Sequence, residues 1–134
     1  MTAALLILVL ATTGPALAEV ARPTTPPAQE ATEALGREAA EQELKEAERA
    51  YLAARQGYEK GSKTADDKRR MARAHYEYGY TVMNSPVLQP FVKYPRALRS
   101  YRAALKLDPG LKEAQEGIDL IEGIYESLGR PVPQ

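Results

Sequence analysis

The 134-residue sequence contains no cysteine. This absence excludes disulfide bonds, thiolate metal ligands, cysteine nucleophiles and the lipid-bearing cysteine that tethers some exported proteins. Tryptophan is also absent, and there is a single histidine, His75. Because a lone histidine without converging ligands does not form a metal site, we expect His75 to be a packed or surface side chain.

An excess of charge of one sign is lacking as well. The 18 basic and 18 acidic residues give a formal net charge of 0, whereas nucleic-acid binding requires an excess of Lys and Arg. We therefore expect no nucleic-acid partner. No Gly-rich phosphate loop, Ser-His-Asp order or metal-ligand spacing occurs either. The sequence thus predicts that the protein is not an enzyme and holds neither a cofactor nor a metal.

Residues 1–18 have the pattern of a secretory signal peptide. Residues 3–10 form an unbroken apolar run, Gly14 and Pro15 follow as a break, and Ala16 and Ala18 place small residues where a signal peptidase requires them. The run is shorter than the roughly 18 residues that span a bilayer, which favours cleavage after Ala18 over a retained anchor. The sequence therefore predicts an exported, periplasmic or extracellular protein that begins at Glu19 and has no membrane insertion after cleavage.

The composition divides the remaining chain into three parts. Residues 19–28 are rich in proline and threonine and predict a disordered linker. Residues 29–129 are dominated by helix formers and predict one all-helical domain, and residues 130–134 form a short C-terminal tail. The domain is expected to open with a long helix, whose apolar positions alternate in steps of four and three and so line one seam: Ala40, Leu44, Ala47, Tyr51, Ala54 and Tyr58.

A second helix is expected over residues 65–83. Thr64 and Asp67 have the spacing of a capping box, which marks the start of this helix. Three prolines in residues 85–95 exclude a continuous helix there. The apolar side chains of this segment are therefore expected to pack as an ordered loop: Val87, Leu88, Phe91 and Val92.

Two further helices are expected after this loop. The third can begin at Pro95, whose fixed backbone angle suits a first helical turn, and it must end before Pro109. Asp108 is the expected cap of the fourth helix, and Gly129 the residue that ends it. The fourth helix has apolar residues at alternating spacings of three and four: Leu111, Ala114, Ile118, Ile121, Tyr125 and Leu128. No strand pattern competes, so the predicted fold class is all-α.

A repeat-like pattern begins with Gly79, a small residue on the second predicted helix. On the third predicted helix a small, an aromatic and a small residue follow, and a proline marks the next turn: Ala97, Tyr101, Ala104 and Pro109. This pattern resembles the tetratricopeptide repeat (TPR), a helix-turn-helix unit. The resemblance implies antiparallel helix hairpins, amounting to about 1.5–2 TPR-like repeats after the long first helix. Small residues let paired helices approach closely, and the Tyr101 ring is expected to fill the gap between them.

The resemblance also implies a binding face, because the first helices of such repeats line a concave groove. The residues expected on this face are Arg73, Tyr76, Tyr80, Met83 and Asn84. The tyrosine rings supply apolar area with little entropy to lose, Arg73 can pair with a carboxylate, and Asn84 can bond a peptide backbone. The expected partner is an extended or helical polypeptide that is not strongly basic.

The sequence therefore predicts an exported, non-enzymatic TPR-like protein–protein interaction module, acting as an adaptor or an assembly factor. Two alternatives remain open. In one, the seam over residues 40–58 forms an intermolecular coiled coil, and the protein is a self-associating structural homo-oligomer of the cell envelope. In the other, the protein is an accessory subunit of an envelope enzyme complex, since such a subunit needs no active site of its own.

Overall fold

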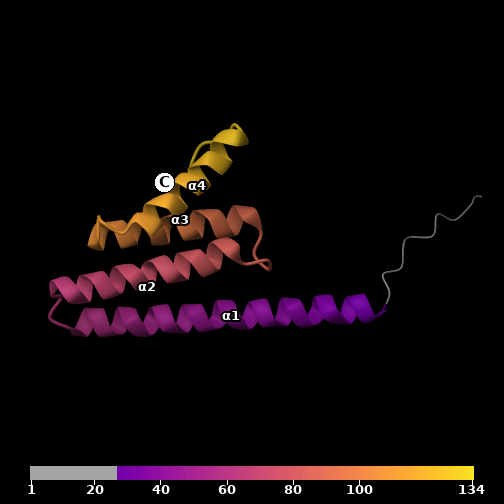
Figure 1. The fold of residues 1–134 in the computed structure, drawn as a ribbon, viewed down its shortest axis with the longest axis horizontal. Coiled ribbons are helices and arrows are strands. Elements are labelled where there is room, and N and C mark those ends of the chain that lie inside the picture. Colours follow the sequence, from indigo (N-terminus) through magenta and orange to yellow (C-terminus); the bar gives the residue numbers. More distant parts are fainter. Residues whose placement is uncertain (1–26) are drawn as a thin grey trace, which may run out of the picture.

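The structure, a computed structural model, describes residues 27–134. These residues form four helices and no strand: α1 (Pro27–Lys60), α2 (Ala65–Asn84), α3 (Pro90–Leu107) and α4 (Lys112–Ser127). The all-α prediction is confirmed for this part of the chain. Helices α1, α2 and α3 lie side by side, and α4 packs mainly on α3 while leaving their row at an angle (Figure 1). The predicted signal peptide, residues 1–18, and the first part of the linker lie outside the described residues.

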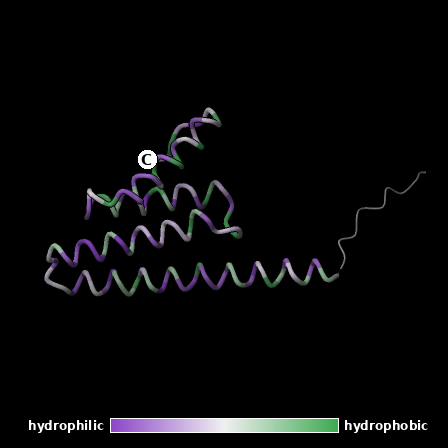
Figure 2. The backbone as a smooth tube through the Cα atoms, viewed as in Figure 1, coloured by the Kyte–Doolittle hydropathy of each residue, from purple (hydrophilic) through white to green (hydrophobic). Residues whose placement is uncertain are grey.

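Helix α1 has one half-buried stripe, and hydrophobic and hydrophilic residues alternate along its length (Figure 2). The half-buried residues are the six of the predicted seam: Ala40, Leu44, Ala47, Tyr51, Ala54 and Tyr58. This stripe packs against α2 of the same chain. The seam that motivates an intermolecular coiled coil is therefore partly covered within the chain, with Leu44, Ala47 and Tyr51 packed against the core. Residues 28–39 are exposed, because α1 extends well beyond the end of α2 (Figure 1).

Helix α2 begins at the predicted capping box. The Thr64 hydroxyl accepts the Asp67 backbone N–H at 3.2 Å, and the Asp67 carboxylate accepts the Thr64 backbone N–H at 3.0 Å. A hydrogen bond from Arg70, followed by those from Thr64, lowers the pKa of Asp67. The start of this helix could be predicted because the capping box satisfies backbone donors locally.

Helix α3 begins at Pro90, so the predicted start at Pro95 is wrong. Pro90 has no N–H to leave unsatisfied in the first turn, and Gln89 closes that turn by accepting the N–H of Val92 at 2.9 Å. Pro95 then lies inside the helix, where it removes one bond to the carbonyl of Phe91. Phe91 is 73% exposed, so water can solvate that carbonyl. The expected packing of Phe91 and Val92 in a loop is also wrong, because both are exposed on the first helical turn.

Helix α4 is not capped by Asp108, contrary to the sequence prediction. Asp108 instead ends α3, and its carboxylate accepts the backbone N–H of Gly110 at 3.1 Å in the connecting turn. Leu111 occupies the cap position of α4 without a side-chain hydrogen bond. A two-residue turn bond of this kind competes with helix capping for the same carboxylate.

The end of α4 follows the prediction. Gly129 has a φ of 61°, and the Arg130 N–H returns to the Tyr125 carbonyl at 2.9 Å, as in a Schellman motif. Leu128, expected on the apolar stripe, is exposed. The C-terminal tail then folds back over α3, where Arg102 donates to the Pro133 carbonyl at 2.8 Å.

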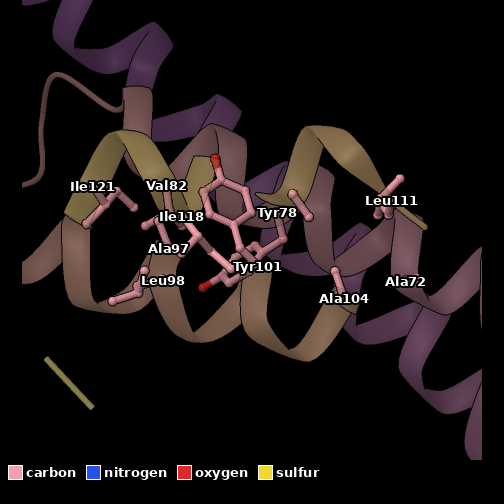
Figure 3. Packing of buried hydrophobic residues seen from close by; sticks show 11 residues of the cluster. Ala72, Tyr78, Val82, Ala97, Leu98, Tyr101, Ala104, Leu111, Ile118 and Ile121 are labelled. Carbon is pink, nitrogen blue, oxygen red and sulfur yellow. The ribbon is translucent and has the colours of Figure 1, made fainter. Parts of the chain in front are cut away.

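Tyr101 lies at the centre of the core. Its side chain is 0% exposed, as the packing argument predicts. A Cβ built on Gly79 of α2 would lie 2.9 Å from Cε1 of this ring, and one on Gly117 of α4 would lie 2.5 Å from Cε2. Both helices therefore approach the two sides of the ring at positions without a side chain. The surrounding cluster includes Ala72, Tyr78, Val82, Ala97, Leu98, Ala104, Leu111, Ile118 and Ile121 (Figure 3).

Candidate functional site

Three tyrosines connect the core to the surface of α2. The ring of buried Tyr101 lies 5.9 Å from that of Tyr76, which in turn lies 6.1 Å from that of Tyr80. Both separations fall within the range of favourable aromatic pairs. Tyr76 is half-buried against the core, whereas Tyr80 is 53% exposed. Of the two rings predicted to receive a partner, Tyr76 therefore supports Tyr80, and Tyr80 is the one that is open to solvent.

Arg73 lies at the α4 edge of these rings. Its guanidinium is 5.5 Å from the centre of the Tyr76 ring and pairs with the Glu113 carboxylate at 3.0 Å. The helix-terminal backbone N–H of Glu113 and then Arg73 hold the pKa of Glu113 below its usual value. Burial and then the charge of Glu113 raise the pKa of Tyr76. Arg73 is thus held in place by α4, and a partner carboxylate would have to compete with Glu113.

Met83 and Asn84 complete the predicted binding face, but they already have partners within the chain. The sulfur of Met83 accepts a hydrogen bond from the Tyr101 hydroxyl at 3.7 Å. The side-chain amide of Asn84 donates to the Tyr80 carbonyl at 2.8 Å, which satisfies a carbonyl in the last turn of α2. The donor that was expected to bond a peptide backbone is therefore engaged by the helix itself.

A small cavity beside Tyr80 contains a residue that the sequence did not indicate. Tyr80 and Asn84 line a space of about 70 Å³ together with Ala40 and Glu43 of α1. Ser85 also lines it, and the Ser85 hydroxyl is buried without a hydrogen-bond partner among the described residues. No sequence signal distinguishes Ser85 from an ordinary residue at the end of a helix.

The structure brings the five predicted face residues together on one side of α2, between α4 and α1. We call this surface the tyrosine face: Arg73, Tyr76, Tyr80, Met83 and Asn84. Its exposed chemistry consists of one aromatic ring, that of Tyr80, and one ion pair, between Arg73 and Glu113. Such a surface can provide apolar contact and hydrogen bonding for a docked chain.

Compared with known proteins, the chain matches no family model, no curated protein and no solved structure. Within residues 27–134, no group of three or more His, Asp or Glu side chains is placed to hold a metal ion. None of the described helices combines the length and the hydrophobicity needed to cross a membrane.

Proposed function

We propose that the protein is an exported, non-enzymatic TPR-like module that binds a polypeptide partner on the tyrosine face. The observation that carries this proposal is the exposure of Tyr80. A large aromatic side chain that is 53% exposed, yet packed against a ring held by the core, presents apolar area at low entropic cost. Residues of this type dominate the energetics of protein interfaces.

Two neighbouring features favour a polypeptide over a small molecule as the ligand. The cavity beside Tyr80 has a volume of about 70 Å³, well below the roughly 300 Å³ of the smallest typical small-molecule sites. Arg73 and Glu113 present both charges at the far edge, which suits a polar peptide without a strong basic excess.

The TPR-like assignment is supported by the packing of α2, α3 and α4 around Tyr101. The resemblance requires small residues where helices meet this ring, and Gly79, Ala97 and Ala104 are all buried there. In such repeats the concave side is lined by the first helix of each pair, to which α2 and α4 correspond in this proposal. The tyrosine face is the side of α2 that lies between α4 and α1.

Site-specific photo-cross-linking in the native host tests the proposal. A benzoylphenylalanine in place of Tyr80 should give a discrete polypeptide adduct. The same probe in place of Phe91 is the matched control, because Phe91 is an exposed aromatic on α3 that is not one of the five residues of the tyrosine face. An adduct of equal yield from both positions, or none from position 80, would contradict the proposed site.

A further inference from the structure

A second concave surface lies between α1 and α3. The cleft has a volume of about 180 Å³ and is lined by Tyr51, His75, Tyr78, Arg96, Arg99 and Ser100. Sites for whole small molecules usually exceed about 300 Å³, so a space of this size suits one side chain of a larger ligand. The cleft contains the only histidine of the sequence.

This cleft is separate from the tyrosine face. Successive residues of a helix are rotated by about 100°, which puts His75 and Tyr78 on the side of α2 roughly opposite Arg73 and Tyr80. Helices α1 and α3 flank α2 on the cleft side, whereas α4 borders the other. A ligand in the cleft would therefore leave Tyr80 free.

The walls of the cleft are built from packed rings. The Tyr51 ring lies 5.0 Å from that of His75 and stacks on that of Tyr78 at 4.9 Å. The buried Ser100 hydroxyl donates to the His75 carbonyl at 2.8 Å, which fixes α3 against α2 at the floor. Burial and then the charge of Arg55 lower the pKa of His75, so its ring is neutral at pH 7. The cleft is thus preformed, with apolar ring surfaces inside.

The rim on the α3 side is cationic. Helix α3 carries five basic residues and no acidic residue: Lys93, Arg96, Arg99, Arg102 and Lys106. Two of these charges are compensated within the chain, since Arg96 pairs with Glu48 at 3.1 Å and Arg102 lies 3.4 Å from Glu122. The exposed guanidinium of Arg99 has no carboxylate partner among residues 27–134.

A second uncompensated cation continues this rim. Lys106 is exposed and lies seven residues after Arg99, hence on the same side of α3 and about 10 Å further along the helix. No ion pair of Lys106 occurs in the described part of the chain either. Two charges at this spacing complement an extended acidic segment better than one small anion.

We propose that this cleft docks an acidic polypeptide segment, with one Asp or Glu side chain inserted beside Arg99. The carboxylate would accept the paired N–H groups of the Arg99 guanidinium, which suits a planar, bidentate contact. The side-chain methylenes would lie against the rings of Tyr51 and His75. A following acidic residue of the same segment would meet Lys106.

The single histidine gives a direct test, because its ring protons report on the cleft alone. In NMR titrations at physiological salt, a hexaglutamate peptide should shift the His75 signal saturably, whereas hexalysine should not. Arg99→Gln should weaken hexaglutamate binding about 5-fold or more, as expected for the loss of a close charge contact. Lys68→Gln, an equal charge change at an exposed site in the first turn of α2, and Tyr80→Ala should leave the affinity unchanged.

Three results would overturn the proposal. One is a His75 signal that hexaglutamate does not shift saturably. Another is an equal loss of affinity in Lys68→Gln and Arg99→Gln, which would make the binding a response to net charge. A third is equally tight binding of free glutamate at the same carboxylate concentration, since the proposal requires a polypeptide. A failure of the cross-link at position 80 would contradict the proposed function on the tyrosine face but would not affect the proposal for this cleft.

Discussion

Replacing Gly117 by alanine perturbs the centre of the fold with a single methyl group. The new Cβ would lie 2.5 Å from Cε2 and 2.7 Å from Cζ of the Tyr101 ring. The ring has no room to retreat, because Gly79 approaches its opposite edge so closely that a Cβ there would lie only 2.9 Å away. The substitution must therefore displace α4 or force the ring into a strained position.

The magnitude follows from two opposing effects. Alanine is a better helix former than glycine by about 0.8–1.0 kcal/mol, whereas overpacking a tight core costs about 1–3 kcal/mol. The contact distances at Gly117 are severe, so we expect the upper part of that cost and a net destabilisation of roughly 2 kcal/mol. Gly123 in the same helix is the matched control, since a Cβ there meets nothing within 4 Å. Gly123→Ala should stabilise the protein by about 0.5–1 kcal/mol.

Urea unfolding followed by circular dichroism measures both variants. Gly117→Ala should lower the free energy of unfolding and Gly123→Ala should raise it. In a Tyr101→Leu background the penalty of Gly117→Ala should largely disappear, because the atoms that it would strike have been removed. If Gly117→Ala were as stable as Gly123→Ala, the close approach of α4 to the Tyr101 ring would be refuted.

Three further predictions concern the core, the pH dependence and export. Ala104→Leu, at a position that is 0% exposed, should cost about 1–3 kcal/mol of unfolding free energy; an unchanged melting temperature would contradict this. Because burial lowers the pKa of His75, the folded protein binds fewer protons than the unfolded chain. This contribution to stability is fully present above about pH 6.5 and is lost as the pH falls through the folded pKa. His75→Gln should flatten that slope, and equal slopes would refute the assignment. Exported protein should begin at Glu19 by intact mass, and a mass that retains residues 1–18 would indicate a membrane anchor instead.

Local patterns could be predicted from the sequence where neighbouring residues alone decide the structure. The seam of α1 follows from helical periodicity, and the start of α2 follows from Thr64 and Asp67, whose hydrogen bonds are made within four residues. The end of α4 at Gly129 depends in the same way on a local left-handed conformation. Periodicity could not tell whether the α1 seam meets α2 or a second chain, because both partners require the same spacing.

The remaining features depend on contacts between distant residues. The start of α3 at Pro90 needs Pro95 inside the helix, one turn after Phe91, a residue that is 73% exposed. The role of Gly117 depends on the position of Tyr101 in space. Within the tyrosine face, periodicity could not distinguish Tyr76 from Tyr80, because only tertiary packing half-buries Tyr76 and leaves Tyr80 exposed.

The affinity of the cross-linked partner for Tyr80→Ala and Phe91→Ala proteins decides whether Tyr80 anchors that partner on the tyrosine face. Isothermal titration calorimetry should show that Tyr80→Ala raises the dissociation constant roughly 30-fold, or about 2 kcal/mol, as expected for an aromatic anchor. Phe91→Ala should bind like the unmodified protein, and both variants should unfold within about 1 kcal/mol of it, because both side chains are exposed. Unchanged affinity in a folded Tyr80→Ala protein would contradict the account and place the binding site elsewhere.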